Sequence, residues 1–469
     1  MLTRRRLFGD GLKVCAGLAL TPGARSFAAA EAVQPLRLGK AGPVPLPGNF
    51  IGLGYEMSSV ARLGLLSATN DRYVQLAKAL GPEGVLRAGG IVADYTRYEA
   101  GGTIKAEPKN TVITRACLEQ MDGFLREVGW TAIWSLNFAQ GSIEDAVGEA
   151  GAVAAALGPR LLAFELGNEV ENYGRGDKPF RKPPYAYETY RKEYAEWHAA
   201  ILKAVPGARF AAPDTASSVE WVERMAADAR GDVQLLTTHY YRGGQKQGTA
   251  DQLLHADPTL RESLLRLRRA SEQSGIPWRM CETNSFFGGG RPGVSDTFTG
   301  TLWTLDFLLL LAEYGCAGVN IETGVNQLGF ISSYSPIQDD GKGVNSAGAS
   351  YYGMLAFAVA RRDCKEVREV QVPEAAQDIT AYALGTAGNM RSVVIINRGD
   401  RDTHVSVAEM GMAQPSAMRL SAPSGSSRTE VTFAGAAVDS GGRWSAKVTE
   451  SVNRADLQVP GMSAVVLRG

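Results

Sequence analysis

The sequence predicts a protein of the α/β class, with a (β/α)8 TIM barrel and a C-terminal antiparallel β-sandwich domain that also takes an N-terminal strand. Three observations support this prediction. The 469 residues exceed one ordinary domain but suit a large barrel with a smaller partner. Short apolar runs alternate with helical patterns from about residue 49 to residue 360. Beyond that point the chain changes to short β-patterned runs between Gly, Ser, Pro and Asn turns.

The barrel prediction rests on eight apolar runs that alternate with amphipathic stretches such as 185–204 and 258–274. Strands are expected at residues 50–55, 84–88, 132–136, 161–166, 209–212, 233–238, 278–281 and 317–321. Eight such βα units are typical of a closed barrel. A doubly wound sheet is the alternative, but its usual Gly-rich phosphate loop is missing, because residues 52–57 (GLGYEM) lack the third glycine.

The C-terminal domain is expected to be an antiparallel sandwich. Its strands are predicted at residues 369–372, 379–384, 392–396, 403–407, 430–433 and 464–467. Residues 33–38 also have a strand pattern and are expected to join this sandwich. The predicted domains are a signal peptide (1–30), an N-terminal strand segment (31–45), the barrel (46–361) and the sandwich (362–469).

The first thirty residues resemble a twin-arginine export signal. Arg5 and Arg6 precede Phe8, a short apolar stretch follows, and Ala28–Ala30 offers small residues for cleavage. We therefore expect a periplasmic or secreted protein. No later segment is apolar enough to cross a membrane, and residues 302–312 are expected to form a buried helix instead.

Composition excludes several classes of protein. The apolar fraction of 45% and charged fraction of 21% are those of a globular chain. Outside residues 1–30 there are 44 basic and 48 acidic groups, a balance of −4 that disfavours nucleic-acid binding. Four His and five Cys without a CxxC motif disfavour a zinc, haem or iron–sulfur protein, and the two-glutamate chemistry described below needs no metal and no cofactor. Four of the cysteines are expected to be free, buried thiols: Cys117, Cys281, Cys316 and Cys364.

Two predicted strand ends carry a glutamate in a distinctive setting. Glu169 ends FELGNE (164–169) after the fourth strand, and Glu282 lies in RMCETN (279–284) at the end of the seventh. A barrel brings both to its C-terminal rim, where barrel chemistry occurs. Two carboxylates about 5–5.5 Å apart can hydrolyse a glycosidic bond with retention of configuration. Either glutamate alone would more often be a helix cap or a salt-bridge partner.

The same residues carry a resemblance to a known family. Asn168-Glu169 and Glu282 resemble the acid/base and nucleophile motifs of retaining (β/α)8 glycosidases. The segment that starts at Glu282 and runs through SFFGGGRPGVSDTF (285–298) resembles glycoside hydrolase family 79, which includes heparanase and microbial exo-β-glucuronidases. LRAGG (86–90) and THYY (238–241) are similar to other strand ends of that family.

The resemblance implies roles for individual residues. Glu169 would be the acid/base and Glu282 the nucleophile. The implied substrate-binding residues are Asn168 (sugar 2-OH), Tyr240 (hydrogen bond to the nucleophile), Glu56 (sugar hydroxyls), Gly288 and Gly289 (uronate carboxylate) and Tyr334 (cap over that carboxylate). Consecutive N–H groups in a glycine turn can form an anion nest, which gives the carboxylate site a physical basis.

Some positions depart from the family pattern or have two interpretations. Phe287 stands where the family often has Tyr, and Glu322 adds a carboxylate after the eighth strand. Glu322 either points away, or binds hydroxyls, or indicates a substrate other than a simple uronide. Asp94 could bind a sugar hydroxyl or fix its own loop. The basic stretch 175–191 is either an acidic-glycan rim or a solvated loop.

The sequence thus predicts a retaining exo-glycosidase whose partner is a glucuronide or an acidic glycan, with no nucleic acid and no membrane insertion after signal removal. One alternative is an endo-acting, heparanase-like hydrolase or an enzyme for another β-linked sugar. A different alternative is a non-catalytic glycan-binding protein on the same scaffold.

Overall fold

The computed structural model describes residues 32–469 except 177, 230, 325–331 and 341–342. The predicted export signal, residues 1–30, therefore lies outside the described residues. From Val33 onward the chain forms one compact unit.

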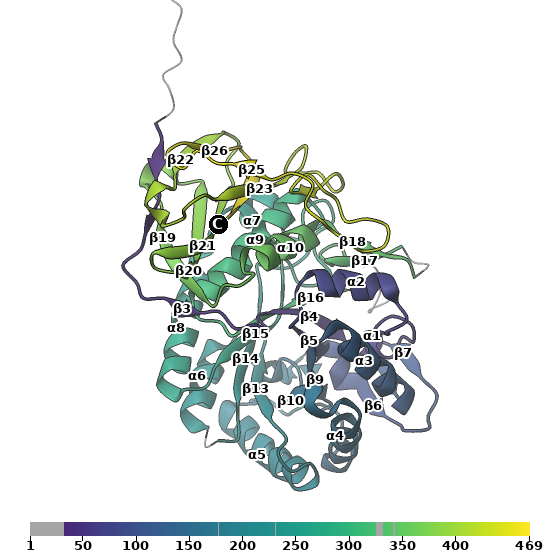
Figure 1. Cartoon of the computed structure of the whole chain (residues 1–469). Coiled ribbons are helices and arrows are strands. Elements are labelled where there is room, and N and C mark those ends of the chain that lie inside the picture. Colours follow the sequence, from purple (N-terminus) through teal and green to yellow (C-terminus); the bar gives the residue numbers. More distant parts are fainter. Residues whose placement is uncertain (1–31, 177, 230, 325–331, 341–342) are drawn as a thin grey trace, which may run out of the picture. The chain divides into compact units, whose positions relative to one another are not determined.

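Eight parallel strands close into a barrel (Figure 1). They are β4 (Ile51–Glu56), β5 (Val85–Gly89), β9 (Thr131–Leu136), β10 (Leu161–Leu166), β13 (Phe210–Thr215), β14 (Leu235–Tyr241), β15 (Trp278–Asn284) and β16 (Val319–Glu322). Pairing of β16 with β4 closes the ring. Each coincides with a predicted strand to within a few residues, so the predicted fold class is confirmed.

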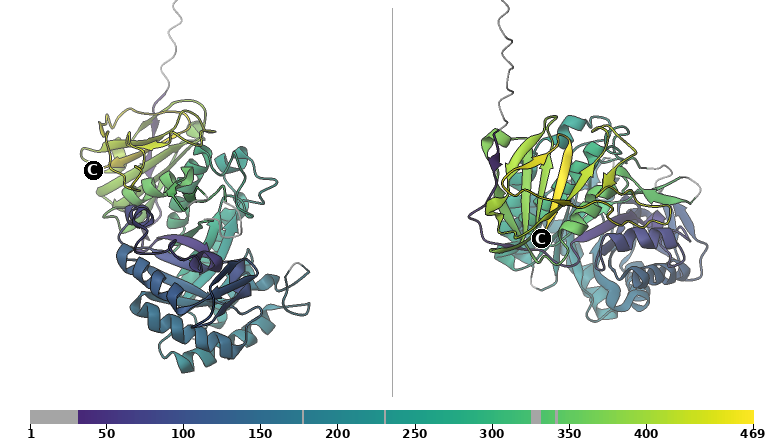
Figure 2. Two further views of the ribbon diagram at one scale, coloured as in Figure 1. Left: turned by 90° about the vertical axis from the view of Figure 1, so that its right-hand side faces the viewer. Right: turned by 45° about the horizontal axis from the view of Figure 1, so that its top comes forward.

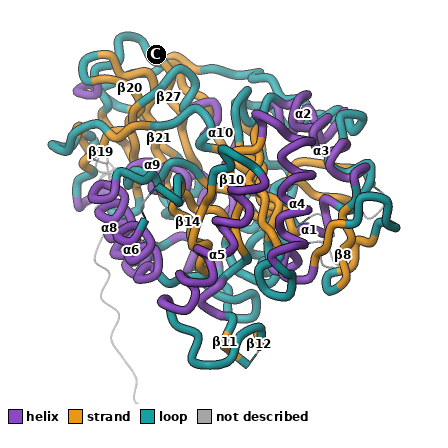
Figure 3. The backbone as a smooth tube through the Cα atoms, turned by 90° about the horizontal axis from the view of Figure 1, so that it is seen from below, coloured by secondary structure: helices purple, strands orange, loops and turns teal. Residues whose placement is uncertain are grey.

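Helices follow the barrel strands, and Figure 3 shows several of them around the barrel. The main ones are α2 (Asp71–Ala79), α3 (Arg115–Val128), α4 (Ile143–Leu157), α5 (Tyr187–Ala204), α6 (Val219–Asp228), α8 (Pro258–Ser274), α9 (Phe298–Glu313) and α10 (Ala349–Ala360). Local residues set their limits. Ser142 begins α4 with a capping box, and Asp257 caps α8 ahead of its first-turn proline. Gly129 and Gly275 end α3 and α8 in the left-handed conformation.

Shorter elements follow the C-terminal ends of the strands, where loops of a barrel build its site. Helix α1 (Met57–Val60) follows β4. The turn η1 (Ile91–Tyr95) follows β5 and leads into a small sheet of β6 (Thr96–Tyr98), β7 (Lys105–Glu107) and β8 (Asn110–Ile113). After β10 come η3 (Val170–Asn172) and the hairpin of β11 (Gly174–Arg175) and β12 (Lys178–Pro179). Helix α7 (Ala250–Leu254) follows β14, and the hairpin of β17 (Ile337–Asp339) and β18 (Asn345–Ala347) follows β16.

The C-terminal residues form two sheets. The larger contains β19 (Glu366–Gln371), β20 (Ile379–Thr386), β21 (Asn389–Asn397), β23 (Ser416–Ser421), β24 (Thr432–Phe433), β25 (Glu450–Ser451) and β27 (Ser463–Arg468). The smaller contains β22 (Thr403–Ser406) and β26 (Leu457–Val459). An apolar cluster that includes Ile395, Val405 and Val465 packs between them. The sequence patterns missed β23, β25 and β26, which are short or carry polar residues.

The N-terminal segment joins both sheets of the sandwich, as predicted (Figure 2). Strand β1 (Gln34–Pro35) pairs with β22, and β2 (Arg37–Leu38) pairs with β19. Strand β3 (Val44–Pro45) also pairs with β19 just before the chain enters the barrel. Leu36, between β1 and β2, is fully buried in the sandwich core.

The sandwich packs on the barrel through α9 and α10, and part of the contact with α9 is polar. Asp306 in α9 accepts hydrogen bonds from Thr380 and Tyr382 and pairs with Arg398. The predicted helix at residues 302–312 is buried within α9, as expected. In the described residues, none of the helices has both the length and the apolarity that a membrane crossing requires.

Candidate active site

The two predicted catalytic glutamates meet at the C-terminal end of the barrel. Glu169 directly follows the turn after β10, and Glu282 lies within β15. A carboxylate oxygen of Glu169 and one of Glu282 lie within 4.8 Å of each other. This separation suits double displacement, because an inverting pair would need about 6.5–9.5 Å to admit a water. Both side chains are largely buried, at 23% and 12% exposure.

The backbone aims Glu169 by an unusual conformation. Its φ of 52° and ψ of 51° are left-handed, a region that non-glycine residues seldom adopt. Asp214, at the end of the adjacent strand β13, is also left-handed, with a φ of 57°. The Glu169 N–H donates to the Asp214 carbonyl oxygen at 2.9 Å, which joins the two strained turns. Strained backbone held by its surroundings is concentrated at functional sites.

A buried arginine organises the floor of the site. The Arg87 guanidinium on β5 donates to Glu282 at 2.7 Å, to Glu165 at 2.8 Å and to Asp214 at 2.6 Å. It also donates to the Asn168 side-chain oxygen at 3.0 Å. Arg87 is fully buried, so these contacts replace the water that a charge requires. Arg87 therefore holds the carboxylate of the candidate nucleophile, Glu282, in place.

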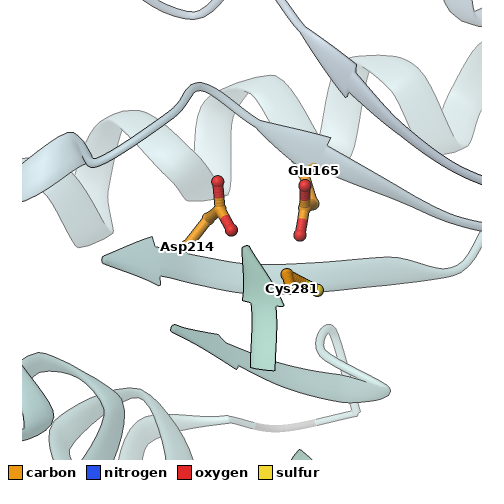
Figure 4. A group of neighbouring side chains, drawn as sticks. All are labelled: Glu165, Asp214 and Cys281. Atoms are coloured by element: carbon orange, nitrogen blue, oxygen red, sulfur yellow. The ribbon is translucent and has the colours of Figure 1, made fainter. Parts of the chain in front are cut away.

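Figure 4 shows the three side chains of Glu165, Asp214 and Cys281, whose donor atoms lie within 4.8 Å of one another. Burial raises the pKa of Glu165 to about 7, and burial raises that of the Cys281 thiol well above its usual value. Two of the members already bind the Arg87 guanidinium. A protonated thiol and two carboxyl groups beside a guanidinium fit a charge network better than a metal-binding set.

His239 and Lys178 place two basic groups beside the catalytic pair. His239 Nε2 lies 2.9 Å from Asp214, and its Nδ1 lies 3.6 Å from Glu169 and 4.0 Å from Glu282. Lys178 Nζ lies 2.6 Å from Glu169 Oε2. Burial lowers the pKa of His239, but Asp214 and Glu282 outweigh it and raise the pKa well above its usual value. Burial likewise raises the pKa of Glu169, but His239 and Lys178 outweigh it and lower the pKa below its usual range.

The tyrosine that contacts the nucleophile is Tyr241, and the prediction of Tyr240 is wrong. The Tyr241 hydroxyl donates to Glu282 Oε1 at 2.8 Å. The Tyr240 hydroxyl instead donates to Asp257, and its ring stacks on Phe307 of α9. Alternate residues of a strand point to opposite faces, so His239 and Tyr241 share the inner face and Tyr240 points outward.

We expect the substitution Tyr241→Phe to lower kcat/KM about ten- to a hundredfold for any glycoside that the protein hydrolyses. The lost hydrogen bond to a carboxylate corresponds to about 1.5–3 kcal/mol. Tyr240→Phe removes the neighbouring hydroxyl on the outer face and should leave kcat/KM within a few-fold of wild type. Steady-state kinetics of the two variants would decide between these positions, and the reverse ranking would restore the original prediction.

The other polar residues predicted to bind sugar hydroxyls also contact groups of the protein itself. Glu56 is buried and accepts a hydrogen bond from the Val92 N–H at 2.8 Å. Its pKa is raised by burial and then by the charges of Glu322 and Glu282. The Asn168 side-chain oxygen is bound by Arg87, which leaves its NH2 group as the atom for a sugar hydroxyl. Asp94 is fully buried, so it fixes its loop, and burial raises its pKa to about 7.

Asp94 fixes that loop through a hydrogen bond from the Tyr173 hydroxyl. Tyr173 in turn contacts the Asn168 N–H. The second of the two interpretations of Asp94 is therefore the one that the structure supports.

The glycine loop, Gly288–Gly290, follows β15, the strand that carries Glu282. Gly288, Gly289 and Gly290 have φ values of 85°, 93° and 80°, which strain any other residue. Within the described part of the chain, the N–H groups of Gly288 and Gly289 have no hydrogen-bond partner. Tyr334 reaches this loop, since its N–H lies 3.4 Å from the Gly289 oxygen and its ring stacks on Tyr241. Phe287 is 58% exposed beside the loop, with its ring edge on Tyr241.

Glu322 points into the barrel. It is 2% exposed, and its Oε2 approaches Gly54 so closely that a Cβ added there would lie 2.5 Å away. Its charge contributes to raising the pKa values of Glu56 and Tyr334, after burial in each case. Of the sequence-based alternatives for Glu322, the one in which it points away is wrong, because the pleat of β16 directs it inward beside β4.

The basic stretch 175–191 is mostly tied to the protein. Arg181 pairs with Glu193 and packs on the rings of Phe138 and Tyr173. Arg191 pairs with Asp232, and Lys178 pairs with Glu169. Arg175 and Lys182 are exposed and could still attract an acidic glycan.

Sequence reasoning missed five residues of the site: Arg87, Lys178, Asp214, His239 and Tyr241. A charged Arg87 inside the apolar LRAGG strand was a usable signal, because a buried charge needs partners. In the sequence, His239 stands out only as part of THYY (238–241), and Lys178 only as one of the basic residues of 175–191. No local pattern indicates which of these cations would reach Glu169.

Comparison with known proteins agrees with this site. No family model matches the chain. A curated β-glucuronidase of Aspergillus niger is 26% identical over 365 residues, covering 70% of this chain and 66% of that protein. One of Neurospora crassa is 24% identical over 400 residues, covering 73% and 70%. The chain thus spans about two thirds of the length of the curated relatives it matches.

Solved structures share the fold over nearly the whole chain. A 4-O-α-L-rhamnosyl-β-D-glucuronidase from Fusarium oxysporum matches with a TM-score of 0.77 and 16% identity, covering 93% of this chain and 99% of that one. An α-L-arabinofuranosidase from Thermotoga maritima matches with a TM-score of 0.68 and 13% identity, covering 93% and 99%.

The closed barrel, its paired glutamates and these relatives define the chain as a glycoside hydrolase of the (β/α)8 type. Within that class, the curated relatives that the chain resembles are both β-glucuronidases, which agrees with the resemblance described from the sequence.

Proposed function

We propose that this chain is a retaining β-glucuronidase that releases β-linked glucuronic acid from glycans or glycoconjugates. The observation that carries the proposal is the approach of Glu169 and Glu282 oxygens to within 4.8 Å at the barrel rim. The names of the curated relatives supply the sugar. The twin-arginine pattern supports action outside the cytoplasm.

The reaction would proceed in two displacements. A Glu282 oxygen forms a bond to C1 while the bond from C1 to the leaving oxygen breaks, and Glu169 gives its proton to that oxygen. Glu169 then takes a proton from water, the water oxygen bonds to C1, and Glu282 leaves as a carboxylate. Tyr241 and Arg87 hold Glu282 through one oxygen each, which fixes the direction of attack.

The N–H groups of Gly288 and Gly289 would bind the uronate carboxylate beside Tyr334. These two N–H groups have no partner among the described residues, and successive free N–H groups of a turn can bind an anion. An aryl β-glucuronide should therefore be hydrolysed, with the β-anomer of glucuronic acid as the first product in proton NMR. The matching β-glucoside and β-galacturonide serve as controls. An α-anomer would contradict the retaining mechanism, and turnover of the glucoside alone would contradict the carboxylate site.

We expect Gly288→Ala to raise KM for the aryl glucuronide about tenfold. A Cβ would have room there, 3.7 Å from Gln245, but the left-handed backbone would cost about 1–2 kcal/mol and turn the amide. Gly293→Ala is the matched control, because Gly293 has a similar φ of 76° in the same loop and an added Cβ would contact nothing within 4 Å. Equal KM values for the two variants would contradict a nest at Gly288.

A further inference from the structure

The acid/base candidate is held by a cation from a loop. Lys178 lies on the short hairpin β11–β12 that follows β10, and its side chain is only 8% exposed. Its Nζ is 2.6 Å from Glu169 Oε2, at hydrogen-bond distance. The neighbour Asn172 contacts the same oxygen at 3.5 Å. In this arrangement the Oε2 that could carry a proton toward a leaving group is occupied by an ammonium group.

Every element packed around Glu169 contributes charge. The basic groups are Lys178 on β12, His239 on β14 and, behind Glu282, Arg87 on β5. The acidic groups are Glu282 on β15, Asp214 on β13, Asp94 on η1 and Glu171 on η3. The His239 ring is bonded to Asp214 and remains 3.6 Å from Glu169. Lys178 is therefore the cation in direct contact with this carboxylate.

We propose that Lys178 is a positioning residue that holds Glu169 ionised and oriented for the water-activating step. This proposal rests on the proposed function. Before the first displacement, Glu169 must part from the ammonium group to carry a proton. The two steps need opposite protonation states of one carboxyl group, and the lysine favours the second. A residue on a hairpin can move away from Glu169 more readily than one within a barrel strand.

The direction of the effect on the pH profile follows. Burial raises the pKa of Glu169, and the neighbouring cations then lower it below its usual range. Removal of one cation leaves Glu169 protonated up to a higher pH. For a substrate with a poor leaving group, the alkaline limb of kcat/KM should therefore move to higher pH, by about one unit or more. When hydrolysis of the intermediate limits kcat, the acidic limb should move in the same direction.

The experiment compares Lys178→Met with wild type on two aryl glucuronides. Phenyl β-glucuronide needs a proton on its leaving group, whereas 2,4-dinitrophenyl β-glucuronide does not. In Lys178→Met we expect the alkaline limb of kcat/KM to shift to higher pH with the phenyl substrate. With the dinitrophenyl substrate we expect kcat/KM to change less than about threefold. Lys178→Arg keeps the charge and should keep the wild-type limbs. Lys192→Met is the matched control, since Lys192 is an exposed lysine on α5 outside the site.

A purely structural role predicts a different result: both substrates would lose the same factor and the limb would stay in place. That outcome would overturn the proposal. A measurement without substrate separates it from the proposed function. In protein labelled with 13C at the glutamate side-chain carboxyl, the signal that Glu169→Gln removes should titrate at higher pH in Lys178→Met than in wild type. An unchanged titration would overturn the role of Lys178, whereas inactivity on glucuronides would affect the proposed function alone.

Discussion

Replacement of Glu282 with glutamine is expected to lower kcat on an aryl β-glucuronide by about ten-thousandfold or more. An amide cannot form the glycosyl-enzyme bond, and the first displacement then has no nucleophile. Arg87 and Tyr241 would still contact the side-chain oxygen in part, so the fold should survive. Steady-state kinetics together with the thermal unfolding midpoint would measure the two effects separately.

The control and the rescue make this result specific. Glu149→Gln changes another buried glutamate, whose hydrogen bond from Trp134 a glutamine can still accept, and it should keep wild-type activity. In Glu282→Ala, added azide should attack C1 from the vacated side and give the α-glucuronyl azide. Residual activity above about a hundredth of wild type in Glu282→Gln, or a β-azide from Glu282→Ala, would assign the nucleophile elsewhere.

Replacement of Glu169 with alanine should have an effect that depends on the leaving group. Loss of the acid is expected to reduce kcat/KM about a hundred- to ten-thousandfold for phenyl β-glucuronide, because the departing oxygen then leaves without a proton. For 2,4-dinitrophenyl β-glucuronide, whose leaving group is stable as an anion, kcat/KM should fall far less. Measurement of both substrates on the same preparation gives the ratio directly.

The same variant tests the second role of Glu169. Hydrolysis of the intermediate lacks its base, so kcat on the dinitrophenyl substrate should fall while KM falls with it. Added azide should speed this step and give the β-glucuronyl azide, the opposite anomer to that from Glu282→Ala. If kcat/KM fell by the same factor for both substrates, Glu169 would not be the acid. Another group near Lys178 would then be the acid.

The fold was largely predictable because its signals are local. Most residues of the barrel strands are buried, and several of the helices between them have caps of their own. The strand patterns failed where burial depends on partners distant in sequence. Strand β25 has two residues, and it exists because β23 offers an edge for pairing.

The site was predictable to the level of its two glutamates and its glycine loop. Glu169 and Glu282 were found because strand ends of a barrel converge on one rim. The prediction of Tyr240 came from the family resemblance, and it was wrong by one residue because alternation along β14 turns Tyr241, not Tyr240, toward Glu282.

The chain alone specifies eight βα units, a sandwich and a pair of glutamates at strand ends, because periodicity and turn chemistry act between near neighbours. Tertiary structure decides which groups surround those glutamates. Arg87, Lys178 and His239 come from three different elements, and their charges act over a few ångströms in a buried space. Protonation of Glu169 therefore depends on contacts that exist only once the barrel has closed.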